Sequence, residues 1–143
     1  MQLYLASGLE NRTRVQEWRD ALTAAGHTIT YDWTAHGRVQ GPQITDIAWK
    51  ELHVGVQESD AVIVLLPGGT GTHTELGAAL AWGKVVILCA PDAGYFDPYS
   101  ERATMAYNHP WISAKLVAPT PDAVLQLLTG VERRVRLRMA APP

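Results

Sequence analysis

The feature that most constrains the fold is residues 60–77, where an unbroken apolar run leads into a glycine-rich turn and then into a helix. Residues 61–66 read Ala-Val-Ile-Val-Leu-Leu, which is typical of a strand covered on both faces of a sheet. A Pro-Gly-Gly sequence ends this run, and the pattern predicts a helix over residues 74–82. A buried strand, a turn and a helix in this order indicate one unit of a parallel sheet.

The rest of the chain repeats this alternation. Further strands are predicted at residues 3–6, 28–31, 85–88 and 114–117, and further helices at residues 11–25, 42–59 and 121–128. The alternation predicts an α/β fold: a single three-layer, doubly wound domain of flavodoxin or Rossmann type. Its five-stranded parallel sheet is expected in the order 2-1-3-4-5, with a ligand at the carboxyl ends of the strands. We expect the domain to span residues 1–130.

A C-terminal tail is expected over residues 131–143. It carries Arg133, Arg134, Arg136 and Arg138. These arginines are interpreted either as a solvated helix end or as a subunit contact.

Composition excludes several classes of function. The chain has 143 residues, with 12 basic and 14 acidic side chains and a net charge of −2, which gives no electrostatic footprint for a nucleic acid polymer. No segment approaches the roughly 18 apolar residues of a membrane span, and the amino terminus lacks the pattern of an export signal, so a cytoplasmic protein is expected. Cys89 is the only cysteine and is expected to be a buried, inert thiol. The histidine spacing predicts no metal site, and no cofactor is expected.

The glycine-rich turn is the clearest candidate binding site. It consists of Gly68, Gly69, Thr70, Gly71 and Thr72. Glycines let a ligand approach the main chain, and the N–H groups of the turn and of the following helix attract an anion such as phosphate. The two threonine hydroxyls add donors. No Gly-Lys-Ser/Thr follows, so the turn is not a Walker A loop. His73 either donates to the same phosphate or is an exposed residue.

Glu75 falls in the first turn of the predicted helix, and two interpretations stay open. Its carboxylate could cap the helix or pair with the Thr72 hydroxyl, which the helix dipole would favour. Alternatively, it points into the cleft that the glycines open, where it could attack an anomeric carbon or stabilise the positive charge that develops as a base departs.

A family resemblance favours the second interpretation. Residues 67–75, PGGTGTHTE, match the PGGxGTxxE signature of the Lonely Guy phosphoribohydrolases. About residues 1–130 resemble the nucleoside 2-deoxyribosyltransferase superfamily, in LYLASG at 3–8, the apolar run at 61–66 and ELGAA at 75–79. That superfamily includes 2′-deoxynucleoside 5′-phosphate N-hydrolases and CMP hydrolases. The resemblance implies cleavage of the N-glycosidic bond of a (2′-deoxy)nucleoside or its 5′-monophosphate, with Glu75 as nucleophile. Hydrolysis is favoured over base exchange, because Pro-Gly-Gly replaces a second acidic residue of the transferases.

The resemblance also implies roles for residues outside the turn. Tyr4 would orient the nucleophile, although ordinary sheet packing is the alternative. The residue that handles the base would be Asp46 or Asp60, with His36 a further candidate for the acid. Ser7 and Gly8, at the end of the first strand, are expected to contact the substrate. A homodimer or larger homo-oligomer is also implied.

Three further expectations remain open. Trp33 either stacks on the base or packs in the core. The loop at residues 108–111 could cover the site of its own chain or that of a neighbour. Two functions without chemistry are the alternatives: a nucleotide-binding sensor that uses the same pocket, and a plain assembly domain.

Overall fold

The structure is a computed structural model that describes residues 1–140, with side chains described up to residue 133. Five parallel strands form one sheet in the order β2-β1-β3-β4-β5, which confirms the predicted topology. The strands are β1 (Gln2–Ser7), β2 (Thr28–Ile29), β3 (Ala61–Leu65), β4 (Val85–Ala90) and β5 (Ala114–Val117). All five residues of β3 are buried, as expected for a strand covered on both faces.

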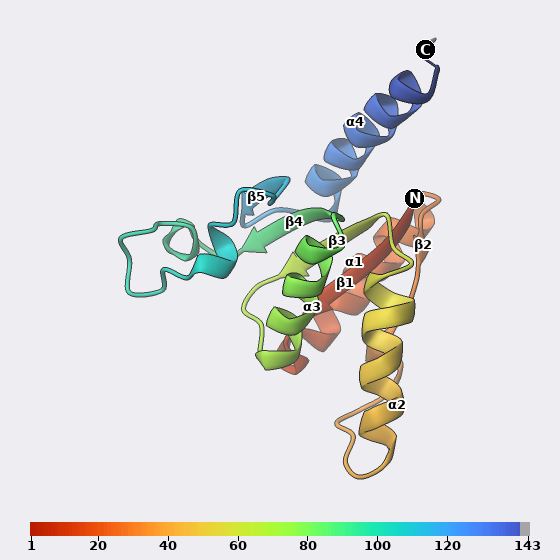
Figure 1. The fold of residues 1–143 in the computed structure, drawn as a ribbon, viewed down its shortest axis with the longest axis vertical. Helices are drawn as coiled ribbons and strands as arrows, with labels where there is room; N and C mark the ends of the chain where they lie inside the picture. Colours follow the sequence, from red (N-terminus) through yellow and green to blue (C-terminus); the bar gives the residue numbers. More distant parts are fainter. Residues whose placement is uncertain (141–143) are drawn as a thin grey trace.

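Helices cover both faces of the sheet (Figure 1), as the three-layer prediction required. The helical segments are α1 (Arg12–Ala24), α2 (Gln43–Lys50), the π-helical turn η3 (Glu51–Val56), α3 (Thr70–Ala81) and α4 (Pro121–Ala140). On one face α1 packs against α4, and on the other α3 packs against η3. Short 3-10 turns are η1 (Leu9–Asn11), η2 (Trp33–Ala35), η4 (Ala93–Tyr95) and η5 (Met105–Tyr107).

The register of the central strands sets where the ligand edge lies. β1 pairs with β3 from Leu3 opposite Ala61 to Ser7 opposite Leu65, so the two strands end side by side. β2 lies beyond β1 and β4 lies beyond β3, so the chain leaves β1 and β3 in opposite directions across the sheet. This is the switch point at which doubly wound proteins bind ligands.

The start of α3 differs from the prediction. The helix begins at Thr70 instead of residue 74, and Gly69 is its extended N-cap residue. The sequence pattern missed this turn because glycine and threonine are weak helix formers. Glu75 consequently lies in the second turn of α3. A capping carboxylate accepts hydrogen bonds from the free N–H groups of the first turn, and Glu75 lies beyond the positions from which a side chain does so. The interpretation of Glu75 as a helix cap is therefore wrong.

The other predicted elements are present, but the helix expected over residues 42–59 is divided into α2 and the π-helical turn η3, and several elements end at other residues. The closing helix continues to Ala140 instead of ending at residue 128, and Arg133 is an exposed residue on it. The side chains of Arg134, Arg136 and Arg138 lie outside those described. Cys89 is buried in β4, as expected, and burial raises the pKa of its thiol to about 12. Within residues 1–140, no helix is both long and apolar enough to cross a membrane.

Candidate active site

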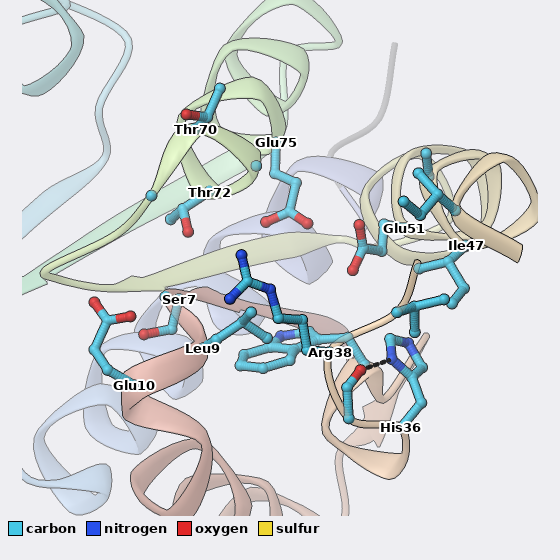
Figure 2. Close-up of a pocket in the computed structure, with 18 residues that line it drawn as sticks. Ser7, Leu9, Glu10, His36, Arg38, Ile47, Glu51, Thr70, Thr72 and Glu75 are labelled. Carbon is cyan, nitrogen blue, oxygen red and sulfur yellow. Dashed lines mark hydrogen bonds between the residues drawn. The ribbon is translucent and has the colours of Figure 1, made fainter. Parts of the chain in front are cut away.

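A cleft of about 610 Å³ opens at the carboxyl ends of β1 and β3, beneath the amino end of α3 (Figure 2). The segment that follows β2 and the helix α2 close its other side. Its lining residues are Ser7, Gly8, Leu9, Glu10, Trp33, His36, Gly37, Arg38, Val39, Ile44, Ile47, Ala48, Glu51, Gly69, Thr70, Gly71, Thr72 and Glu75. The cleft therefore lies at the predicted edge of the sheet and contains most of the predicted binding residues.

Glu75 lines the cleft and is held by Tyr4, a buried residue that does not itself line the cleft. The Tyr4 hydroxyl donates a hydrogen bond of 2.7 Å to Glu75 Oε1. Tyr4 is fully buried and Glu75 is only 6% exposed. Burial raises the pKa of Glu75 to about 8, although the hydrogen bond from Tyr4 lowers it and the neighbouring Glu51 raises it. Burial, with Glu75 beside it, also holds the pKa of Tyr4 well above its usual value, so Tyr4 remains a donor.

Glu51 is another carboxyl group of the cleft, and the sequence analysis missed it. It begins the π-helical turn η3, and its side chain points into the cleft beside Glu75 (Figure 2). Burial raises the pKa of Glu51 above its ordinary value, and His36 opposes this shift. One signal was available, because Glu51 lies four residues after Ile47 and so falls on the apolar face of the predicted helix.

The two aspartates that were expected to handle the base do not line the cleft. Asp46 is exposed on α2 and pairs with Lys50 at 2.8 Å. Asp60 precedes β3 and therefore lies at the amino edge of the sheet, where its carboxylate accepts a hydrogen bond of 2.7 Å from the Gln2 N–H. Both positions are wrong for a group that acts on a ligand in the cleft, since one faces solvent and the other lies across the sheet.

The amino end of α3 forms one wall of the cleft, as expected from the glycine-rich turn. Gly69, Thr70, Gly71 and Thr72 line it, and Thr72 is buried. Gly68 does not line the cleft. It lies so close to the Thr72 side chain that an added Cβ would collide with it. Gly68 therefore serves the packing of the turn.

His73 faces away from the cleft, contrary to its expected role as a phosphate donor. Its Nδ1 lies 2.7 Å from the Gly69 carbonyl oxygen, and its Nε2 lies 2.7 Å from the Tyr107 hydroxyl. The early start of α3 explains this orientation, because each residue in a helix turns about 100° from the one before it. Thr72 and Glu75 share the face toward the cleft, and His73 lies beside that face.

Ser7, Gly8 and Trp33 line the cleft from the side of β1. The Ser7 hydroxyl donates to the Leu65 carbonyl oxygen at 2.6 Å, which joins the ends of β1 and β3. The Trp33 indole N–H donates to the Leu5 carbonyl oxygen at 2.7 Å, and the side chain is 4% exposed. Trp33 thus packs in the core and also lines the cleft, and its stacking on a base stays a prediction.

Arg38 is a further cleft residue that the sequence analysis missed. It lies between η2 and α2, and its guanidinium points into the cleft beneath Thr72 and Glu75 (Figure 2). Although Glu10, Glu51 and Glu75 line the same cleft, Arg38 forms no ion pair with any side chain described up to residue 133. The available signal was a basic residue in the glycine-containing loop after the second strand, at the predicted ligand edge. Arg38 is therefore free to meet an anionic ligand.

The loop at residues 108–111 lies beside a different hollow. His109 and Trp111 line a largely apolar depression of about 420 Å³ with His73 and Leu76 of α3. This depression shares no lining residue with the cleft, so the loop does not cover the cleft of its own chain. Within the described part of the chain, no three His, Cys, Asp or Glu side chains gather as metal ligands would.

The fold and the cleft define a doubly wound α/β protein with a cleft at its topological switch point, where proteins of this fold class bind ligands. No protein-family model matches the chain, and no curated protein matches it in sequence. Among solved structures, it is similar to the CMP N-glycosidase BcmB of Clostridium botulinum, with a TM-score of 0.55 and 20% identity over 90% of this chain and 98% of that chain. At this identity the similarity shows a shared α/β fold, in agreement with the fold predicted from the sequence.

Proposed function

We propose that the protein is an N-glycosidase that hydrolyses a (2′-deoxy)nucleoside or its 5′-monophosphate. Glu75 is the nucleophile, and Glu51 is the acid that protonates the departing base. The observation that carries this proposal is that the carboxyl groups of Glu51 and Glu75 lie beside one another in one cleft, with Glu75 held by Tyr4 at 2.7 Å. Nucleophile and acid in glycoside cleavage are commonly two such groups with different surroundings. The fold shared with a CMP N-glycosidase supports the same class of substrate.

In the first step, a Glu75 oxygen forms a bond to C1′ as the C1′–N bond breaks. The electron pair of that bond leaves with the base, which takes the proton of Glu51. In the second step, water attacks C1′ of the glycosyl ester and gives a proton to Glu51, and Glu75 is released as a carboxylate. The products are the free base and the sugar, and both glutamates return to their starting forms.

Hydrogen-bond donors at the amino end of α3, together with Arg38, favour a 5′-monophosphate over an unphosphorylated nucleoside as the substrate. The first N–H groups of α3 have no acceptor within the helix, and the Thr70 and Thr72 hydroxyls lie beside them. Arg38 supplies a cation that no described carboxylate neutralises. Arginine binds phosphate through two parallel N–H groups, which suits this position.

Chromatography of reaction mixtures tests the proposal. The protein is incubated with ribo- and 2′-deoxynucleosides and their 5′-monophosphates, with and without an acceptor base, and free base and new nucleosides are quantified. We expect free base from a monophosphate, and a loss of orders of magnitude in rate for Glu75→Gln. Asp46→Asn should retain activity, because Asp46 lies outside the cleft. Full activity in Glu75→Gln would contradict the assignment, and product that forms only with an acceptor base would indicate a transferase.

A nucleotide-binding sensor is the second candidate, and one observation favours it. With a pKa of about 8, Glu75 is mostly protonated at neutral pH, and a protonated carboxyl group is not a nucleophile. A sensor would bind a nucleotide equally well as wild type and as Glu75→Gln, and it would release no base from any compound in the panel.

A further inference from the structure

Gly55 lies against the ring of Tyr4 with no space for a side chain. A Cβ added at Gly55 would lie 2.6 Å from Cε2 and 2.8 Å from Cδ2 of the tyrosine ring, and its three nearest atoms all belong to that ring. Real Cβ atoms do not approach other atoms so closely. Both residues are buried, so neither solvent nor a gap separates them.

The backbone at Gly55 is itself held in place. The Thr30 hydroxyl, just after β2, donates a hydrogen bond of 2.7 Å to the Gly55 carbonyl oxygen. The same hydroxyl lies 3.2 Å from the Leu3 carbonyl oxygen, on the strand that carries Tyr4. Gly55 and Tyr4 are thus connected through Thr30 as well as through direct contact, and the main chain of η3 cannot move away from the ring without breaking these bonds.

We propose that Gly55 is a positioning residue, whose missing side chain lets the Tyr4 ring lie where its hydroxyl meets the Glu75 carboxylate. This inference rests on the function proposed above. Gly55 does not line the cleft, and the three atoms nearest to an added Cβ all belong to Tyr4, so its effect on the site passes through Tyr4. A methyl group at Gly55 displaces the ring, and the hydrogen bond of 2.7 Å between Tyr4 and Glu75 is lengthened or lost.

The π-helical turn η3 gives this role a structural basis. Its first residue, Glu51, lines the cleft, and Gly55, four residues later, lies against Tyr4. One irregular turn therefore carries the proposed acid and also supports the residue that holds the nucleophile. π-Helical turns are rare and occur often at functional sites.

The first test is Gly55→Ala, with Gly77→Ala as matched control because a Cβ at Gly77 meets nothing within 4 Å. We expect kcat of Gly55→Ala to fall roughly 10- to 100-fold, as for a displacement of about 1 Å at a reacting group. KM should stay within about twofold, since Gly55 does not line the cleft. Because the bond from Tyr4 lowers the pKa of Glu75, the pH profile should also move to higher pH. Gly77→Ala should match the wild type in all three measurements.

A double-mutant cycle with Tyr4→Phe separates positioning from general damage. If Gly55 acts through the hydroxyl of Tyr4, Gly55→Ala should lower kcat by less than about twofold in the Tyr4→Phe background. An equal loss of kcat in both backgrounds, or wild-type kcat and pH profile in Gly55→Ala, would overturn the inference. A wild type that releases no base would instead contradict the proposed function itself.

The inference stays testable if Gly55→Ala does not fold. In a Tyr4→Ala background the ring is gone, and Gly55→Ala should then unfold at the same temperature as Tyr4→Ala alone. An equal loss of folding in both backgrounds would show that the added methyl group meets something other than the ring, and the inference would be wrong.

Discussion

Tyr4 and Glu75 lie 71 positions apart in the chain and share a hydrogen bond of 2.7 Å between two buried side chains. Burial acts on both groups in the same direction, since it raises the pKa of each. The hydrogen bond opposes this for Glu75, because a donor stabilises the ionised carboxylate. Tyr4 thereby makes the charged form of Glu75 more accessible than burial alone would allow.

We expect Tyr4→Phe to raise the pKa of Glu75 above its value of about 8, because the donor is removed while the burial remains. Each pKa unit added to Glu75 reduces its ionised fraction at pH 7 about tenfold, and kcat/KM at pH 7 should fall in proportion. The measurement is the pH dependence of kcat/KM. Tyr99→Phe, at a position 95% exposed, is the control. A profile for Tyr4→Phe identical to that of the wild type would contradict the role given to Tyr4.

Glu51→Gln should reverse the pH dependence of kcat/KM, from a fall with rising pH in the wild type to a rise in the variant. The proposed reaction needs one proton on the Glu51–Glu75 pair, so wild-type kcat/KM should fall as the last proton leaves, at about pH 8. With glutamine at position 51 the acid is lost, and the remaining activity requires only that Glu75 be ionised. That low activity should therefore rise through the same pH range.

The pH series for Glu51→Gln is run beside Glu58→Gln, an exposed residue after the same turn. Glu58→Gln should keep the wild-type profile. If kcat/KM of Glu51→Gln still fell with rising pH, the acid that titrates would be a group other than Glu51.

The centre of the sheet was predictable because β3 and β4 are apolar along their whole length. The run at residues 61–66 is hydrophobic on both faces, so its burial did not depend on knowing its neighbours. The same geometry excludes Asp60, since a residue that precedes a parallel strand lies at the edge opposite the ligand. The position of Glu75 beside the glycine-rich turn was predictable for a similar reason, because both belong to one continuous strand–turn–helix segment.

Arg38 and Glu51, which the sequence analysis missed, come from the segment between β2 and β3. The positions of Arg38 and Glu51 depend on how this segment crosses the carboxyl ends of the strands. Tertiary packing sets that path, so the local sequence pattern does not predict it. The error at His73 has a local cause. The low helix propensity of threonine and glycine argued against a helix through Thr70 and Gly71. The helix α3 nevertheless begins four residues earlier than predicted, and this changes which side chains face the cleft.

Glu75→Gln should be more stable than the wild type at alkaline pH. Because the folded-state pKa of Glu75 is raised from 4.5 to about 8, the folded protein binds more protons than the unfolded chain between these values. The contribution of Glu75 protonation to the free energy of unfolding is present in full below about pH 4.5 and is lost as the pH rises through about 8. At about 1.4 kcal/mol for each pKa unit, the loss has an upper bound of about 5 kcal/mol.

Denaturant unfolding of wild type and Glu75→Gln across this pH range measures the difference. The two free energies of unfolding should separate as the pH rises, because the neutral glutamine has no charge to desolvate. Glu17→Gln, at an exposed position on α1, is the control for the change of residue type. Parallel curves for wild type and Glu75→Gln would show that Glu75 ionises in the folded state as easily as in the unfolded chain.

Arg38→Ala should separate phosphorylated from unphosphorylated substrates. If the guanidinium binds the 5′-phosphate, its removal should raise KM for the monophosphate about 10- to 100-fold, the range of a charge-assisted hydrogen bond. KM for the unphosphorylated nucleoside should change by less than about threefold, because that substrate has no anion for Arg38 to bind. Arg38→Lys should recover part of the loss, since it keeps the charge without the paired N–H groups. Arg133→Ala, exposed on α4, controls for net charge. Equal losses for both substrates would mean that Arg38 shapes the cleft and does not recognise the phosphate.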